Sequence, residues 1–241
     1  MVLTEKQING LNETERQVYE YVVEHKEKVS QMKIRELANH LHLSTTTISR
    51  FCKKLGFSGF SELKIKLNLF SMETHAIGEE ELHPDFDYLI RLNSQQMKSK
   101  VQSLANYIKD SNELIFLGLG TSGHMARYAS KYFGMMGTTS QAIDDPYYPY
   151  IDKDYTGTVL VVLSRAGATP SILERMAYMK KRGAYIVSLT NTSQTGVAKN
   201  SHFVLDYYVP KKEAHLSDVT SQAPTILLLE SIAHHLYKLS A

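Results

Sequence analysis

The sequence contains a single cysteine, Cys52, among its 241 residues. One cysteine excludes a disulfide within the chain and a metal site built from several cysteines. No apolar run approaches the roughly 20 residues that a membrane-spanning helix needs. The N-terminal stretch M-V-L-T-E-K-Q also lacks the apolar core of a signal peptide. We therefore expect a cytoplasmic protein that does not interact with a membrane.

The charge of the chain is small overall but unevenly distributed. The formal net charge is +2, with 43% hydrophobic and 22% charged residues, as in ordinary globular proteins. Residues 30–70 carry a local charge of +5, so the remainder sums to −3. A chain of this length can form two domains. A basic segment on a near-neutral body favours a polyanion-binding domain joined to a second domain.

The basic segment contains two short stretches with apolar residues at helical spacing. Ser44 can cap the second stretch through its hydroxyl group. Two helices so closely spaced match a helix-turn-helix, whose second helix enters the major groove of DNA. The turn carries His42 where glycine is usual, and histidine tolerates a positive φ better than most residues. The apolar positions are Leu37, Ala38 and Leu41 in the first stretch and Ile48, Phe51, Cys52 and Leu55 in the second.

The outward positions of this second helix are rich in hydroxyl groups and cations, which suit contacts to DNA phosphates and base edges. An ordinary pair of surface helices with a basic outer face is the alternative. One recognition helix covers few base pairs, so we expect a homo-oligomer, a dimer or tetramer, on a duplex DNA operator. The predicted DNA-binding residues are Ser44, Thr45, Thr46, Thr47, Ser49, Arg50, Lys53 and Lys54.

The run R-F-C-K-K-L-G-F-S-G-F-S-E-L-K, which starts at Arg50, resembles the N-terminal domain of RpiR-type bacterial transcription regulators. The resemblance covers about residues 1–72. Asn12 and Glu15 have the spacing of a capping box for an earlier helix, and Ser61 is expected to cap a helix that runs through Phe70. Residues 73–84 lose periodicity and are interpreted as a linker.

From Leu114 onward, buried strands alternate with helices, a pattern that predicts a parallel sheet. The expected fold is therefore an all-α helix-turn-helix domain, residues 1–72, joined to a three-layer α/β/α domain, residues 85–241. The expected strands are 114–119, 158–164, 184–190 and 202–206. The expected helices are one long helix at 86–108 and others at 123–135, 170–181 and 219–239.

Two strand ends have the composition of a phosphate cradle, G-L-G-T-S-G at 118–123 and S-R-A-G-A-T-P at 164–170. Each joins a buried strand to a helix, so backbone N–H groups and the positive helix end point at the same place. The alternative is that Ser122 and Thr169 are ordinary helix caps.

The first loop also matches G-x-G-x-x-G formally, but residues 141 and 142, where a dinucleotide site needs an acid, are Gln and Ala. We expect no cofactor.

The pair of loops resembles the sugar isomerase (SIS) domain, which binds phosphosugars, over about residues 86–241. The resemblance implies a phosphosugar effector and matches the family's T-N-x-S turn to Thr190, Asn191 and Ser193. Ala166 departs from it, because family members usually carry a serine there; Arg165 is a candidate replacement for the missing donor. The implied effector-binding residues are Gly120, Thr121, Ser122, Ser164, Arg165, Gly167 and Thr169, with Glu213 from a polar segment read as a mobile loop over the site.

A sugar isomerase would need a general base and acid, for which Glu213, His215 and Glu230 are candidates. For Glu213 and His215, the alternative is that they are ordinary exposed loop residues. No spacing of carboxylates and histidines indicates a metal site. The helix-turn-helix favours a non-enzymatic regulator of sugar metabolism whose second domain senses a phosphosugar. The alternative is a phosphosugar isomerase or a bifunctional enzyme with an added DNA-binding domain.

Overall fold

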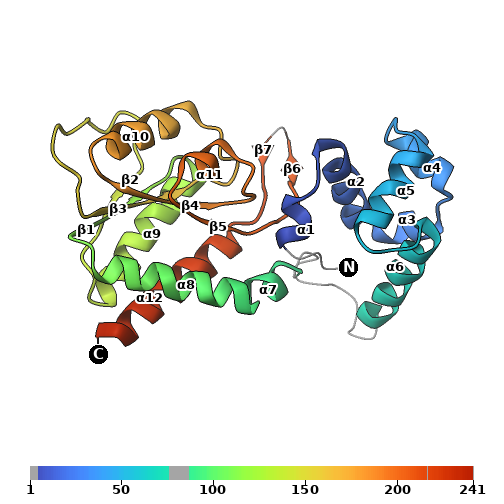
Figure 1. Ribbon diagram of the computed structural model, residues 1–241, viewed down its shortest axis with the longest axis horizontal. Coiled ribbons are helices and arrows are strands. Elements are labelled where there is room, and N and C mark those ends of the chain that lie inside the picture. Colours follow the sequence, from blue (N-terminus) through green and yellow to red (C-terminus); the bar gives the residue numbers. More distant parts are fainter. Residues whose placement is uncertain (1–4, 76–86, 216, 241) are drawn as a thin grey trace. The chain divides into compact units, whose positions relative to one another are not determined.

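The computed structural model describes residues 5–75, 87–215 and 217–240. The chain forms two compact units, shown in Figure 1. The first comprises Met1–Asp87 with Pro210–Thr220, and the second comprises Tyr88–Val209 with Ser221–Ala241. Within the described part of the chain, no helix combines the length and the apolar character required to span a membrane.

The N-terminal segment of the first unit is helical, and its capping box is confirmed. Asn12 Oδ1 accepts a hydrogen bond from the Glu15 backbone N–H at 2.8 Å, and Glu15 Oε2 accepts one from the Asn12 N–H at 2.9 Å. These two bonds satisfy N–H groups that the first helical turn leaves free. The helices are α1 (Glu5–Asn9), α2 (Glu13–Glu24), α3 (Lys26–Gln31), α4 (Ile34–His40), α5 (Thr45–Lys54) and α6 (Phe60–His75).

The start of α6 differs from the prediction. Ser61 does not cap the helix but lies inside its first turn, because the helix begins at Phe60. Glu62 instead accepts a hydrogen bond from the Ser58 backbone N–H at 2.6 Å. The helix also runs past Phe70 to His75, into the segment interpreted as a linker. Residues 76–86, which hold the rest of that segment, lie outside the described residues.

The second unit contains the predicted parallel sheet, with five strands in the order β2-β1-β3-β4-β5. Its order reverses between β1 and β3: the chain proceeds from β1 to β2 on one side and from β3 to β5 on the other. In open parallel sheets, ligands bind beyond the carboxyl ends of the strands at such a switch point. The strands are β1 (Glu113–Leu117), β2 (Gln141–Ile143), β3 (Thr158–Leu163), β4 (Tyr185–Thr190) and β5 (Phe203–Asp206), of which β2 is not among the predicted strands.

Helices cover both faces of the sheet, which confirms the three-layer α/β/α architecture (Figure 1). Successive residues of β1 point to opposite faces. Phe116 packs in the core that holds α8, α9 and α12, whereas Ile115 packs in the core that holds α10 and α11. The helices of this unit are α7 (Asp87–Leu92), α8 (Gln95–Lys109), α9 (Thr121–Met135), α10 (Pro170–Lys181), α11 (Gly196–Asn200) and α12 (Ala223–Ser240).

Three expectations for residues 85–241 are wrong in detail. The single helix expected at 86–108 is two helices, because Ser94 caps α8 by accepting a hydrogen bond from the Met97 N–H at 3.2 Å. The last helix begins at Ala223 rather than 219. The segment read as a mobile loop contains a hairpin, β6 (Glu213–Ala214) and β7 (Ser217–Asp218), which belongs to the first compact unit.

Candidate DNA-binding and phosphate-binding sites

The helix-turn-helix of the first unit consists of α4, the turn after it and α5. Ser44 caps α5 as predicted: its Oγ accepts a hydrogen bond from the Thr47 N–H at 3.0 Å. His42 has φ +53°, the left-handed conformation that the turn requires. Ile48, Phe51 and Cys52 are fully buried. The inner face of α5 is therefore held by the core, which leaves the opposite face to solvent.

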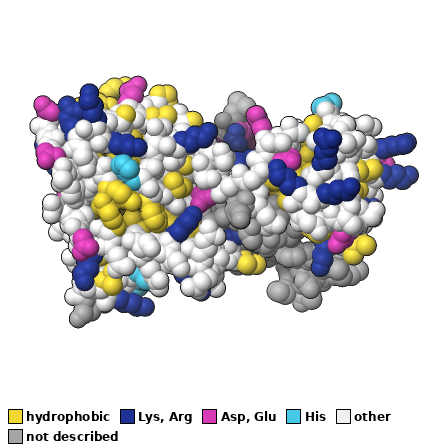
Figure 2. Space-filling model, in the orientation of Figure 1, with side chains coloured by type: hydrophobic (Ala, Val, Ile, Leu, Met, Phe, Trp, Pro, Cys, Tyr) yellow, Lys and Arg dark blue, Asp and Glu magenta, His cyan; other side chains and the backbone are white. Residues whose placement is uncertain are grey.

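The predicted DNA-binding residues lie on or beside that outer face. Thr46, Arg50 and Lys53 are exposed and lie on a single helix. Lys54 forms an ion pair with Glu15, whereas Arg50 and Lys53 have no ion pair within the described residues. Figure 2 shows Lys and Arg side chains spread over the visible face of this unit. Ser44 and Lys54 are exposed as well, and Thr45, Thr47 and Ser49 are partly buried.

The first glycine-rich loop connects β1 to α9. Gly120, at φ +56°, occupies the cap position, so α9 begins at Thr121, two residues before the start expected at about Gly123. Ser122 is consequently not the helix cap that the alternative interpretation requires. The hydroxyl groups of Thr121 and Ser122 form no hydrogen bond with any described residue. Both are therefore available to a ligand.

The second loop connects β3 to α10 and is held by the Ser164 side chain and by a hydrogen bond from α11. Ser164 is buried, and its Oγ accepts a hydrogen bond from the Gly167 N–H at 3.2 Å. Gly167 has φ +64°, and its carbonyl accepts a hydrogen bond from the Val197 N–H at 3.0 Å. Thr169 stands at the cap position of α10, but its side chain makes no capping hydrogen bond. Its hydroxyl group therefore does not serve as an ordinary cap either.

The two loops leave the sheet side by side. Their strands are paired in parallel, with Leu117 of β1 in register with Val162 of β3, and they flank the switch point of the sheet. Neither α9 nor α10 carries an acidic residue in its first turn. The carboxylate packed against the first turn of α9, that of Asp144 beside Gly123, is paired with Arg127. The positive ends of both helices thus face this edge, an arrangement that favours anions.

Arg165 and Ala166 occupy the middle of the second loop. Ala166 is exposed and adds no hydrogen-bonding group, as the sequence indicates. Arg165 is partly buried and lies close enough to Tyr207 for its charge to act on the phenol. Burial raises the pKa of Tyr207, and the positive charge of Arg165 opposes part of that rise. Tyr207 also accepts a hydrogen bond from Thr225 Oγ1 at 2.8 Å, which joins this region to the start of α12.

The T-N-x-S turn after β4 ties the neighbouring strand ends together. Asn191 Oδ1 accepts a hydrogen bond from the Val209 N–H at 2.8 Å, and its Nδ2 donates to the Val209 carbonyl at 3.0 Å. Thr190 Oγ1 donates to the Arg165 carbonyl at 3.4 Å. The carboxyl ends of β3, β4 and β5 therefore form one connected edge. The sequence marks only the turn itself and does not reveal the amide clamp of Asn191.

The candidate acid–base residues belong to both compact units. Glu213 is exposed on β6, where it forms an ion pair with Lys211. His215 lies in the same hairpin. Glu230 of α12 accepts a hydrogen bond from Tyr128 Oη at 2.5 Å, and this bond raises the pKa of Tyr128 to about 12. No cluster of three or more metal-binding side chains occurs among the described residues.

Both units match known families. Residues 3–70 match the family described as "Helix-turn-helix domain, rpiR family". Residues 107–233 match the family described as "SIS domain".

Curated relatives cover most of the chain. The HTH-type transcriptional regulator HexR of Pseudomonas aeruginosa is 25% identical over 95% of this chain and 86% of its own length. A bifunctional protein glk of Burkholderia thailandensis is 24% identical over 88% of this chain, which matches 36% of that longer protein. Among solved structures, the Vibrio vulnificus NanR protein complexed with ManNAc-6P has a TM-score of 0.51 and 19% identity, over 97% of this chain and 91% of that one. This likeness shows a shared fold.

Proposed function

The chain belongs to the RpiR family of helix-turn-helix regulators with a SIS domain, and on that premise we propose that it is a cytoplasmic regulator of sugar metabolism whose second unit senses a phosphosugar. Binding of the phosphosugar changes the affinity of the first unit for its DNA operator. A ligand can do so only by favouring one arrangement of the protein over another. A tenfold change in DNA affinity requires about 1.4 kcal/mol of differential binding.

One observation carries the effector part of this proposal. The hydroxyl groups of Thr121, Ser122 and Thr169 lie at the first turns of α9 and α10, and none of them caps its helix. They stand at paired strand ends on either side of the switch point, where α9 and α10 begin without an acidic residue in their own first turns. Neutral donors beside helix N-termini are suited to a phosphate group. The phosphosugar named with the NanR structure belongs to the same chemical class.

A phosphosugar isomerase or bifunctional enzyme is the second candidate function, since one curated relative is named as a bifunctional protein. The interactions of two candidate acid–base residues favour the regulator. Glu213 forms an ion pair with Lys211, and Glu230 of α12 accepts a hydrogen bond from Tyr128 of α9, so each carboxylate already has a partner within its own unit. A turnover assay with aldose and ketose phosphates distinguishes the two functions, because isomerisation would be detected without any DNA.

The proposal is tested by a thermal-shift screen of the full chain against sugar phosphates, with the unphosphorylated sugars as matched controls. We expect at least one phosphate, and none of the parent sugars, to raise the melting temperature. Each hit is then added to a DNA-binding titration with an operator selected from random duplexes. The proposal fails if no sugar phosphate binds at millimolar concentration, or if the hits leave DNA affinity unchanged.

A further inference from the structure

Arg91 of α7 is a buried cation whose hydrogen-bonding capacity is only partly used. Only 6% of its surface is exposed. Its Nη2 donates to the Tyr208 carbonyl at 2.6 Å, and its Cζ lies 5.9 Å from the centre of the Tyr208 ring. Nε and Nη1 are buried and have no partner among the residues that the structure describes. A guanidinium group stays charged in proteins, and buried N–H groups nearly always have an acceptor.

The protein does not neutralise this charge within the described segments. No described carboxylate forms an ion pair with Arg91. The buried carboxylate at the end of β5, Asp206, is instead paired with Lys100, whose Nζ lies 3.0 Å from Oδ1. A buried charge without a counterion is costly, and N–H groups without an acceptor add to that cost. The two unpartnered nitrogens of Arg91 therefore point to a ligand that supplies the missing negative charge.

A second buried arginine in the same unit shows what a purely structural role looks like. Arg175 is 4% exposed, and both of its terminal nitrogens donate to backbone carbonyls, those of Tyr148 and Pro149. Its guanidinium also lies 4.3 Å from the centre of the Tyr150 ring. Both terminal nitrogens of Arg175 therefore have backbone acceptors and anchor a loop, in contrast to Nε and Nη1 of Arg91.

The position of Arg91 places it at the ligand edge of the sheet. Tyr88, three residues earlier on the same helical face, is part of the core of the second unit, so α7 is anchored there. The bonding partner of Arg91, Tyr208, immediately precedes the Val209 that Asn191 clamps. Arg91 thus lies beside the end of β5, two strands from β3, a separation of roughly 10 Å at the usual strand spacing. An extended sugar phosphate bound at β1 and β3 reaches about that far.

We propose that Arg91 binds a second anionic group of the effector, so that the effector is a phosphosugar that carries a further acid group. A carboxylate and a second phosphate share the required chemistry, an anionic oxygen that accepts from guanidinium N–H groups. This inference rests on the proposed function and narrows its ligand from sugar phosphates in general to those with two acidic groups.

Calorimetric titration with two matched pairs of probes tests the inference. 6-Phosphogluconate and glucose 6-phosphate differ in a carboxylate at C1, whereas fructose 1,6-bisphosphate and fructose 6-phosphate differ in a second phosphate. We expect the wild-type chain to bind the doubly acidic member of at least one pair about tenfold or more tightly, since bonds to charged groups are strong. The pair that shows the preference identifies the acid group.

Two substitutions then assign the preference to Arg91. Arg91→Gln should bring the affinity ratio close to 1 while binding of the monophosphate changes less than about threefold, and Arg91→Lys should retain part of the preference. Arg182→Gln, which removes a cation paired with Asp152 elsewhere in the unit, should keep the wild-type ratio.

The inference is overturned if the wild-type chain binds both members of each pair equally, a measurement that does not depend on the folding of any variant. It is also overturned if the preference survives in Arg91→Gln. If no sugar phosphate binds at all, the proposed function itself fails and this inference falls with it. Binding of monophosphates without discrimination would leave the proposed function standing.

Discussion

A Cβ atom added to Gly167 would lie 2.2 Å from Cβ of Thr195, far closer than two carbon atoms can approach. Thr195 is fixed in place because it caps α11, accepting a hydrogen bond from the Ala198 N–H at 3.2 Å. The loop after β3 and the loop after β4 therefore meet at a contact that only glycine allows.

Gly167→Ala should destabilise the second unit, because the clash adds to the strain of an alanine at φ +64°. We expect a loss of about 2–4 kcal/mol in the free energy of unfolding, measured by urea denaturation. Gly59→Ala is the matched control, since no atom lies within 4 Å of its added Cβ. Equal stability of the two variants would show that the loop relaxes without cost.

Thr169→Val should weaken phosphosugar binding without weakening the fold. Thr169 makes no capping hydrogen bond, so loss of its hydroxyl should change the free energy of unfolding by less than about 0.5 kcal/mol. A lost hydrogen bond to a charged phosphate should reduce affinity about tenfold or more. Calorimetry and denaturation of the same sample measure the two effects separately.

Thr169→Ser is the control, because it keeps the hydroxyl group and should retain most of the affinity. Ala166→Ser is the complementary change, which restores the serine usual in the family and should strengthen binding. If Thr169→Val lowers stability but not affinity, the residue is structural and the phosphate does not bind there.

Arg50→Ala should weaken operator binding by roughly 1–3 kcal/mol if its side chain reads a base. Arg50 is exposed on α5 and has no ion pair within the described residues, so the substitution leaves the core intact. Lys28→Ala on α3 removes one positive charge from the same unit and serves as control. A fluorescence anisotropy titration in which Arg50→Ala and Lys53→Ala both match the wild type would exclude this face of α5 as the base-reading surface.

His202 should make stability depend on pH. Burial and the nearby charge of Lys180 lower the pKa of His202, and its Nδ1 accepts a hydrogen bond from the Ile186 N–H at 2.9 Å. The folded state therefore favours the neutral ring. As pH falls below about 6.5, the unfolded chain takes up a proton before the folded chain does. Stability should fall between that pH and the lower pKa of the folded state, and then level off.

His202→Asn supplies an acceptor that does not titrate, so its free energy of unfolding should decline less between pH 7 and pH 5 than that of the wild type. His235→Asn, on the exposed side of α12, controls for the removal of a histidine. Parallel pH profiles for wild type and His202→Asn would count against this role.

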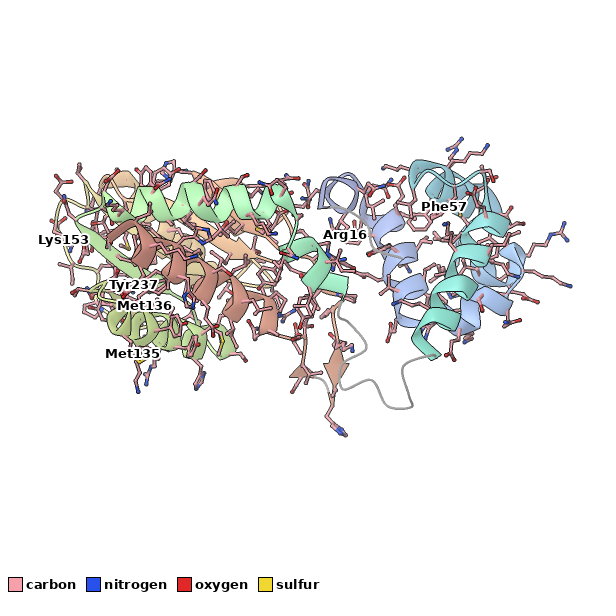
Figure 3. All side chains as sticks on the ribbon, turned by 90° about the horizontal axis from the view of Figure 1, so that it is seen from below. Arg16, Phe57, Met135, Met136, Lys153 and Tyr237 are labelled. Carbon is pink, nitrogen blue, oxygen red and sulfur yellow. The ribbon has the colours of Figure 1, made fainter. Side chains whose placement is uncertain are left out.

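Apolar side chains at the ends of α9 and α12 suggest a surface for the predicted homo-oligomer. Met135 and Tyr237 are 68% and 53% exposed, and Figure 3 shows them with Met136 toward one end of the second unit. Met135→Glu with Tyr237→Glu should reduce the sedimentation coefficient by introducing charge into an apolar contact. A sedimentation coefficient of a monomer for the wild type at micromolar concentration would contradict the prediction.

The long, strongly patterned elements could be predicted from the sequence, and the short or exposed ones could not. β3 is six consecutive buried apolar or β-branched residues, which is a distinctive signal. β2 is three residues long, one of them exposed, so it offers too short a pattern. The break before α8 could not be predicted because apolar spacing continues on both sides of Ser94. The hairpin at β6 and β7 is exposed throughout and has no hydrophobic pattern.

The two loops of the phosphate-binding site could be predicted from the sequence, but their position side by side at one edge of the sheet could not. Glycine and hydroxyl content marked the loops, whereas their pairing depends on which strands lie side by side. The buried charge of Arg91 could not be predicted either, because an arginine on an amphipathic helix is normally exposed. Arg91 is buried by contacts with residues far away in the chain, such as Tyr208.

The chain passes from one compact unit to the other three times, at Asp87, at Val209 and again at Thr220. A single cut between α6 and α7 would therefore not separate the two units cleanly, because residues 210–220 would stay with the C-terminal fragment. A gene truncated at that point would encode a helical unit that lacks part of itself. An exchange of the N-terminal unit between related proteins would therefore also have to exchange residues 210–220.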